Sequence, residues 1–243
     1  GRIDLGIEQA GDTLRLASDF DLAGQQLALR GLRLPGPATD ITGTAEIALQ
    51  RLLATGALTG QLGDLAALEP WTGQPLRGSA VVDATFDGRQ GRQDAGIDLV
   101  VDDLAGDFGV LRQASGQASL VDVTDRLGGG ATTSAPGFRQ PEPGVVLNDA
   151  TIRVLGDRNL FNLEANAAGE MNGPFNVRTA ARADVMGASQ TVTVDSLEGV
   201  FQGQSIRLLS PATGRLDRGV LDIDQLDLRI GDARIQGDLN LDQ

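Results

Sequence analysis

The chain of 243 residues contains no cysteine, histidine, lysine or tyrosine. Without cysteine there are no disulfides and no thiolate metal sites. Without histidine the commonest general base, the Ser-His-acid triad and the usual zinc ligands are missing. The glycine-rich stretches GLRLPG and LGGGATTS lack the lysine of a P-loop and the Gly-x-Gly-x-x-Gly order. The sequence therefore offers no recognisable nucleophilic, zinc or nucleotide chemistry, and we expect no catalytic residues, no metal and no cofactor.

Aromatic residues are also scarce, at 3% of the chain, with one Trp and seven Phe. Because 41% of the residues are hydrophobic, burial must depend on Leu, Val, Ile and Ala. Carboxylates are plentiful, and glycoside cleavage needs only two of them, but sugar sites normally carry aromatic platforms. A carboxylate-based hydrolase is therefore kept as a third alternative only.

Positive charge is in deficit, because 33 Asp and Glu face 20 Arg and give a net charge of −13. A nucleic acid or an anionic membrane attracted by charge is therefore not expected as a partner. The sequence contains no run of about 18 apolar residues and opens with no cleavable signal pattern. Its first residues, GRIDLGIEQ, already have the alternation expected in the middle of a strand, so we expect a fragment of a longer protein.

What the sequence does contain is short runs in which apolar and polar residues alternate, separated by many of its 33 glycines. Alternation with period two predicts strands with one apolar and one polar face. With turns every 8–12 residues, the chain is predicted to be all-β with roughly twenty strands.

A second regularity lies inside these runs, where the spacing apolar-x-apolar-x-x-apolar recurs six times. Such a step would turn the second half of a regular strand to the wrong face. A β-bulge or a tight corner at the two inserted residues restores the facing and bends the strand. The inserted pairs are Arg30-Gly31, Gln50-Arg51, Asp102-Asp103, Asn148-Asp149, Asp195-Ser196 and Asp224-Gln225. Four of the copies are spaced by about 50 residues, which suggests an irregular repeat.

Two segments depart from the β pattern. In residues 63–71, Asp64 can cap a short helix near 64–70 that Pro70 ends, and Trp71 is interpreted as a plug that packs this helix against the sheet. Residues 127–144 contain three Pro and many Gly and are predicted to form a loop or linker. It would separate β segments at 1–126 and 145–243, which we expect to belong to one continuous sheet.

The acidic cluster Asp222, Asp224 and Asp227 raises the possibility of a calcium site. It lacks the Gly and the bidentate Glu of an EF-hand loop, so we interpret it as a solvated strand face opposite Arg229 and Arg234. The same interpretation applies to Asp102-Asp103.

The apolar strand faces can be buried in three ways: two sheets pack, a barrel closes, or one sheet curls into a groove for an apolar ligand. Sandwich cores generally use aromatic residues to fill about 10 Å between sheets, whereas a groove for acyl chains needs none. The composition favours a lipid groove, with a closed aliphatic core as the alternative. The candidate lining residues are Leu14, Leu16, Phe20, Leu22, Leu27, Leu29, Leu221, Ile223, Leu226, Leu228, Ile230, Ile235, Leu239 and Leu241.

Four stretches share one texture of strand, turn and glycine-led strand: RGVLDIDQLDLRIGDARIQGDLNL, GDLAALEPWTGQPLRGSAVVDATFDG, SIRLLSPATGRLDRG and LNDATIRVLG. This texture resembles the recurring unit of the AsmA-like superfamily, in particular its TamB branch of the bacterial translocation and assembly module. The resemblance spreads over most of the chain. It lies in the pattern of residues and not in particular positions, since members of the family share few fixed residues.

The resemblance implies a protein of the Gram-negative periplasm, anchored in the inner membrane. Its antiparallel-rich sheet would curl into a U-shaped β-taco with an aliphatic interior. The implied ligands are phospholipid acyl chains moving between the membranes, and the implied partner of the full-length chain is an Omp85-type outer-membrane protein that acts in protein secretion and outer-membrane biogenesis. This chain lacks the N-terminal membrane helix of complete members.

A structural or adhesive β-solenoid or β-sandwich, with a fully closed aliphatic core and no bound lipid, is the alternative function. Strand alternation alone does not distinguish a closed core from an open groove.

Overall fold

The computed structural model divides the chain into two compact units, Gly1–Asp125 and Arg126–Gln243. The fold is all-β, and each unit is a curled antiparallel sheet. The described residues of the two units together form 18 strands. The structure describes residues 1–9, 12–36, 38–89, 91–125, 127–140, 144–157, 160–184, 189–217 and 220–242. Both the all-β class and the expected number of strands are confirmed.

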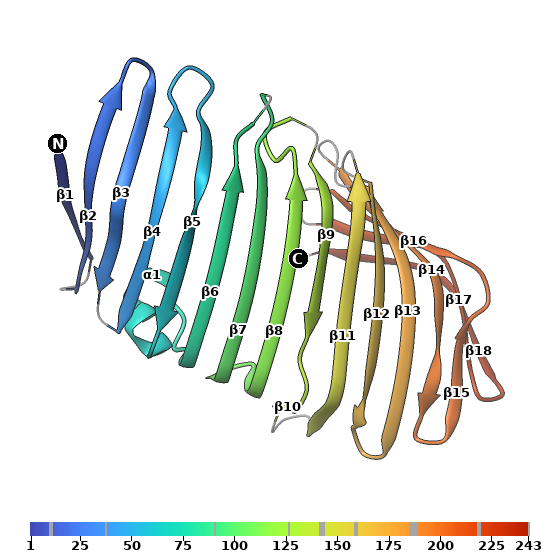
Figure 1. The fold of residues 1–243 in the computed structure, drawn as a ribbon. Coiled ribbons are helices and arrows are strands. Elements are labelled where there is room, and N and C mark those ends of the chain that lie inside the picture. The colour runs from blue at the N-terminus through green and yellow to red at the C-terminus, as the bar shows by residue number, and fades with distance from the viewer. Residues whose placement is uncertain are drawn as a thin grey trace. The chain divides into compact units, whose positions relative to one another are not determined.

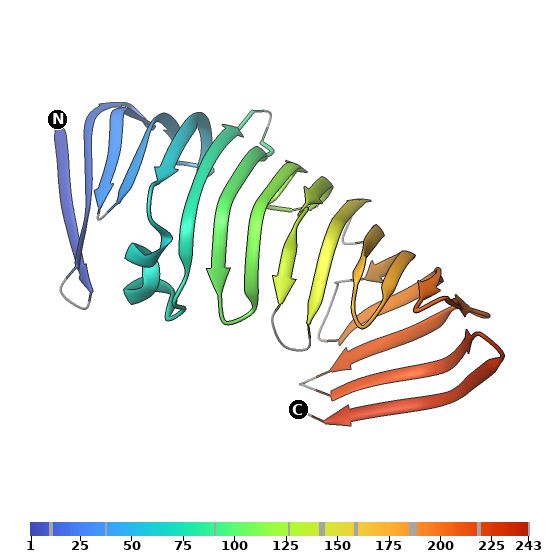
Figure 2. The same cartoon turned by 90° about the horizontal axis from the view of Figure 1, so that it is seen from below.

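The first unit is a meander in which each strand pairs with the next one along the chain, always antiparallel (Figure 1). Figure 2 shows that its strands are bowed along their length. The strands are β1 (Arg2–Gln9), β2 (Asp12–Ala23), β3 (Gln26–Gly36), β4 (Thr39–Ala48), β5 (Leu53–Leu62), β6 (Arg77–Asp87), β7 (Asp94–Gly106) and β8 (Gly109–Val121).

The second unit follows the same plan, but two of its strand positions are each filled by a pair of short strands. β9 and β10 both pair with β11, and β15 and β16 both lie between β14 and β17. The strands are β9 (Gly128–Ser134), β10 (Phe138–Gln140), β11 (Val145–Asp157), β12 (Leu160–Glu170), β13 (Pro174–Asp184), β14 (Ser189–Phe201), β15 (Gln204–Leu208), β16 (Ala212–Asp217), β17 (Val220–Ile230) and β18 (Ala233–Asp242).

Each division of a strand contains a proline, Pro136 between β9 and β10 and Pro211 between β15 and β16. Proline has no N–H to donate to the ladder. The neighbouring backbone keeps its partners, because Ala135 N donates to Ala150 O at 2.9 Å and Leu209 N donates to Asp227 O at 2.8 Å. The interruptions are therefore local, and the sheet continues past them.

The phase steps predicted from the sequence correspond to irregularities of the sheet. Five of the six pairs fall at register shifts, those at Arg30-Gly31, Asp102-Asp103, Asn148-Asp149, Asp195-Ser196 and Asp224-Gln225. The sixth pair, Gln50-Arg51, lies in the turn that joins β4 to β5. The five register shifts return the following apolar residues to their original face, as predicted. After the sixth pair the prediction was wrong, because Leu52 stays in the turn and is 77% exposed.

The short helical segment is confirmed, although its end was predicted wrongly. A 3₁₀ helix η1 (Leu65–Leu68) continues into α1 (Glu69–Thr72), and the Asp64 carboxylate accepts from Ala66 N at 2.9 Å as the N-cap. Pro70 lies in the first turn of α1, where its missing N–H has no helical partner to lose. The chain leaves the helix at Gly73, with φ of 66°. The side chain of Trp71, predicted to be a plug, lies outside the described residues.

The prediction of a loop over residues 127–144 was wrong for most of its length, because β9 and β10 occupy it. β9 has the sequence GGGATTS, in which the two Thr favour strands, and pairing with β11 outweighs the glycines. Residues 141–143 lie outside the described residues, and the boundary between the two units falls earlier, after Asp125.

Neither unit encloses a core of the kind found in a sandwich. Among the described residues, six apolar residues are buried and no large side chain is completely enclosed. The six are Leu53, Leu65, Ala80, Leu111, Ala181 and Ala212. A closed two-layer sheet would bury its inward-facing residues along every strand.

Candidate functional site

The first unit carries an uninterrupted aliphatic face, defined by the residues in register with Leu16 of β2 and Leu29 of β3. Directly opposed residues of antiparallel strands share a face, so Leu16 shares this face with Leu5, and Leu29 with Phe20 and Ala45. Among the described residues of β1 to β8, Asp12 at the start of β2, opposite Gln9, is the one charged residue at these registers. On β4 to β8 the larger members are Ile41, Ile47, Leu58, Leu62, Val82, Phe86, Ile97, Leu99, Val101, Leu104, Leu111 and Leu120.

The second unit has an aliphatic face of the same kind, defined by the residues in register with Leu163 of β12 and Leu228 of β17. Leu163 opposes Val154 and Ala181, and Leu228 opposes Leu208 and Ile235. Three of its phenylalanines lie close to strand ends. The larger members on β11 to β15 are Val145, Leu147, Ile152, Val154, Phe161, Leu163, Phe175, Val177, Val192, Val194, Leu197, Phe201, Ile206 and Leu208.

The predicted lining residues fall into two groups, each at aliphatic-face registers of its own unit. Leu22 opposes Leu27 in the first unit, and Ile223, Leu226 and Ile230 lie on β17 in the second. Leu14, Leu221, Leu239 and Leu241 occupy matching backbone registers, but their side chains lie outside the described residues. Sequence reasoning missed the contributions of β4 to β8 and β11 to β15. The same alternation was visible there, for example at Val82, Ala84 and Phe86.

Exposure alternates along the strands, with the aliphatic side the less exposed one. In β4, Ile41, Gly43 and Ala45 are half-buried, whereas Thr42 and Thr44 are exposed. The same alternation runs along β8 and β12. An isolated flat sheet would expose both faces alike, so each sheet curls toward its aliphatic side.

The aliphatic faces are nevertheless open to solvent over much of their area. Leu99, near the middle of β7, is 39% exposed, and Leu5 and Ile235 on the outermost strands of their units are 57% and 48% exposed. Exposed apolar side chains on many neighbouring strands are typical of a binding surface. In the first unit, η1 packs against β6 and buries Leu65 to 7% exposure.

The opposite face of each sheet is polar, and in the second unit an ion pair and a hydrogen bond on this face contact two of the bulges. Arg182 Nε and Nη2 donate to the two carboxylate oxygens of Asp195, the inserted residue of β14, at 2.8 and 2.6 Å. Hydrogen bonding from this guanidinium, followed by its charge, lowers the pKa of Asp195 despite partial desolvation. In β17, Gln225 N donates to Asp238 Oδ1 at 2.8 Å. The bends are therefore held by specific contacts on the polar side.

The acidic cluster on β17 has the structural role inferred from the sequence. Arg234 donates to both Asp227 oxygens at 2.8 and 2.7 Å, and this hydrogen bonding is the main reason that the pKa of Asp227 is lowered. Asp222 accepts from the Asn240 amide, and Asp102 accepts from Gln113 at 3.0 Å. No group of three or more acidic side chains in the described part of the chain has the arrangement of a metal site.

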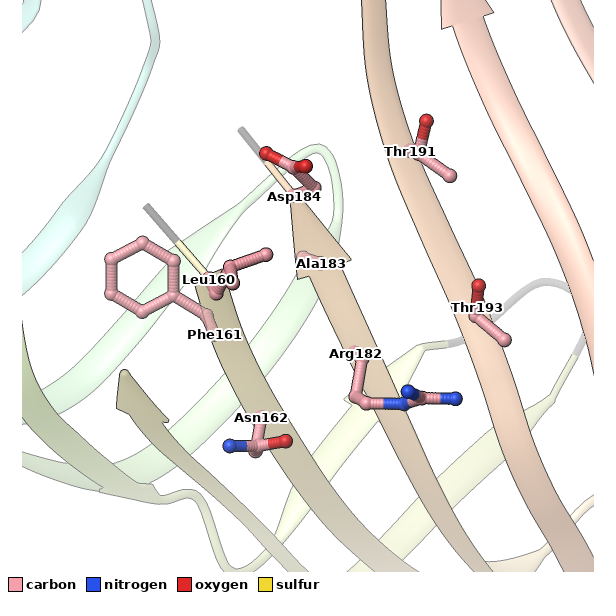
Figure 3. Close-up of a pocket in the computed structure, with 8 residues that line it drawn as sticks. All are labelled: Leu160, Phe161, Asn162, Arg182, Ala183, Asp184, Thr191 and Thr193. Atoms are coloured by element: carbon pink, nitrogen blue, oxygen red, sulfur yellow. The ribbon is translucent and has the colours of Figure 1, made fainter. Parts of the chain in front are cut away.

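One pocket lies where β12, β13 and β14 meet near their ends, with a volume of about 360 Å³ (Figure 3). The Arg182 guanidinium in its wall is held by Asp195, and as a cation it cannot act as a base. The pocket is lined by Leu160, Phe161, Asn162, Arg182, Ala183, Asp184, Thr191 and Thr193.

Comparison with known proteins gives no assignment: no protein-family model, curated protein or solved structure matches this chain. In the described residues, no helix has the length and apolar character needed to cross a membrane. Among the described residues, the aliphatic faces extend over more strands than the pocket in Figure 3.

Proposed function

We propose that this chain is a non-enzymatic segment of a lipid-transport protein, in which phospholipid acyl chains lie along the aliphatic faces while the headgroups stay in water. The single observation that carries the proposal is the continuity of these faces. On β4 to β8, strand after strand presents Leu, Ile, Val and Ala at the same register without a charged residue, and the sheet leaves many of these side chains half exposed.

The physical basis is transfer of hydrocarbon out of water. Each buried methylene contributes about 0.8 kcal/mol without any specific hydrogen bond. A lining of branched aliphatic side chains has no polar group that would hold an acyl chain at one position, so a chain can slide along it. No bond is made or broken, which agrees with the lack of histidine, cysteine and lysine.

The wider setting of the proposal follows from the resemblance to the AsmA-like superfamily and its TamB branch. The full-length protein would be anchored in the inner membrane and reach through the periplasm. It would move phospholipid toward the outer membrane beside an Omp85-type partner and take part in outer-membrane assembly and protein secretion.

The alternative, a structural or adhesive β-module, requires a closed aliphatic core. Among the described residues, exposed large apolar side chains such as Leu99 and Leu5 outnumber buried ones. This observation favours a surface that accepts an apolar ligand.

Two neighbouring residues with equal exposure give a matched test of the proposal. Leu99 and Val100 are each 39% exposed, but Leu99 opposes Val82 and Gly116 on the aliphatic face, whereas Val100 opposes Val81 and Ser115 on the polar face. A charge at Leu99 interrupts the apolar surface, and a charge at Val100 does not.

The experiment is native mass spectrometry of the purified chain after incubation with phosphatidylethanolamine in detergent. We expect wild type and Val100→Arg to retain lipid, and Leu99→Arg and Leu228→Arg to lose most of it. Absence of bound lipid from wild type, or equal lipid retention by all four proteins, would contradict the proposal. Circular dichroism verifies that each variant keeps its strands.

A further inference from the structure

The polar face of the second unit contains a straight row of arginines across neighbouring strands. Arg178 on β13 opposes Glu198 on β14, Glu198 opposes Arg207 on β15, and Arg207 opposes Arg229 on β17, which in turn opposes Arg234 on β18. Four cations and one anion thus share one line in a chain whose net charge is −13.

This row is unfavourable for the sheet by itself. Like charges directly opposite each other on antiparallel strands are destabilising, and the row contains two such contacts, Arg207 with Arg229 and Arg229 with Arg234. With 33 acidic residues available, opposite charges at these positions would have stabilised the sheet. A bound anion removes the repulsion.

The hydrogen bonds show which guanidinium groups remain able to bind. Arg234 is held by Asp227, because two of its nitrogens donate to that carboxylate. Arg178 uses Nε to donate to Asn166 at 2.8 Å, which leaves its terminal nitrogens. Arg207 lies 3.8 Å from Glu198, at the outer limit of an ion pair. Among the described residues, the Arg229 side chain makes no hydrogen bond or ion pair.

Arg178, Arg207 and Arg229 line one pocket with a volume of about 670 Å³. Asn176 and Ser205 add an amide and a hydroxyl as neutral donors, and Val200 and Leu209 supply an apolar part of the wall. Glu198 is the one acidic lining residue, so the lining has a net charge of +2. The volume is within the range of small-molecule sites and exceeds the size of a bare phosphate ion.

We propose that this pocket binds a phosphate ester, with the phosphate held by Arg178, Arg207 and Arg229 and the organic part against Val200 and Leu209. The planar guanidinium fork matches two phosphate oxygens at once. The ester is either a soluble phosphate or the headgroup of a phospholipid at a membrane surface. The pocket is on the face opposite the aliphatic face, so this site does not depend on the proposed function.

The test uses calorimetric titration of the purified chain with glycerol 3-phosphate at low ionic strength. Arg207→Gln and Arg229→Gln each remove one pocket cation. Arg153→Gln is the matched control, because Arg153 lies on the same polar face opposite Glu164 and does not line the pocket. We expect saturable binding to wild type and Arg153→Gln, and binding at least fivefold weaker for each pocket variant. Salt should weaken binding to wild type because the arginines are exposed.

A second measurement distinguishes the two sources of the phosphate. If vesicles of phosphatidylglycerol in phosphatidylcholine retain wild type but not Arg229→Gln, the ligand is a lipid headgroup. If glycerol 3-phosphate binds and vesicles retain neither protein, it is a soluble ester. Leu99→Arg, which tests the aliphatic face, is expected to bind glycerol 3-phosphate like wild type. Absence of saturable binding to wild type, or equal weakening by Arg153→Gln and Arg229→Gln, would overturn the proposal.

Discussion

The two units have the same aliphatic face but different polar faces. In residues 1–125, 18 acidic residues accompany nine Arg, a net charge of −9, whereas residues 126–243 contain 15 acidic residues and 11 Arg, a net charge of −4. The first unit opposes Asp83 to Asp98 on its polar face, and the second opposes Arg207 to Arg229.

The aliphatic face is common to both units, whereas the charges on the polar face differ between them. A polar face needs only to remain in water, so its charges are free to differ. The aliphatic face occurs in both units, and a single charge on it would interrupt a continuous apolar surface. The two units therefore have an apolar surface in common, and each unit has a different arrangement of charges on its polar face.

The largest effect is expected from glycines at which neighbouring strands approach closely in each unit. A Cβ at Gly56 would fall against the Thr44 carbonyl oxygen, and one at Gly199 against that of Asn176. Gly56→Ala and Gly199→Ala should each lower the free energy of unfolding by about 3 kcal/mol, measured by urea denaturation. Gly237→Ala is the control, since nothing lies within 4 Å of its added Cβ. An equal loss in the control would show that the close approach of the neighbouring strand at Gly56 and Gly199 is not the cause of the destabilisation.

A smaller loss is expected at Gln93, which completes the ladder of β5 in the first unit. Its side chain accepts from Ala54 N at 2.7 Å and donates to Ala54 O at 2.9 Å, and the residue is 8% exposed. Gln93→Ala leaves both Ala54 groups unpaired and should destabilise the first unit by about 2 kcal/mol. The exposed Gln117→Ala is the control for urea denaturation. If both variants match wild type, water replaces the Gln93 amide without loss.

Acid should affect the two units through different carboxylates. The pKa of Asp195 is lowered mainly by hydrogen bonding from Arg182, and the pKa of Asp94 mainly by the backbone N–H of Asp122, with Arg92 adding to it. A lowered pKa in the folded state gives stability that is present above about pH 4 and is lost as the pH falls through the folded-state value.

Thermal melts of wild type and Asp195→Asn at pH 6 and pH 3 test this expectation for the second unit. Wild type should be the more stable protein at pH 6, and the difference should be smaller at pH 3, because the stability from a lowered pKa starts to be lost below the ordinary pKa of the carboxyl. A difference that stays the same at both pH values would contradict the role of the Arg182 pair.

The smallest effect is expected from the like-charge pairs. Asp98→Asn in the first unit should raise the free energy of unfolding by about 0.2–1 kcal/mol, and the gain should fall as salt is added. Arg229→Gln in the second unit should gain less, because Arg229 also attracts Asp227. Asp21→Asn, which removes an attractive partner 3.8 Å from Arg30, should give no gain in the same urea titration.

Much of the fold was predictable because its signals are local. The alternation of Ile223, Leu226 and Leu228 with charged residues marks a strand and the place where its phase changes, and the structure has its bulge there. β9 was missed because its glycines suggest a loop when β11 is not considered. Gln93 was missed because its partner, Ala54, is 39 residues away along the chain.

The sequence by itself determined that every strand has one aliphatic and one polar face, since that property depends on residue order with period two. Only the tertiary structure decided which strands lie side by side and in which register. Arg178, Arg207 and Arg229 lie far apart in the sequence and have no common spacing. They form one row because the hydrogen bonds from β13 to β17 fix the neighbouring strands at a single alignment.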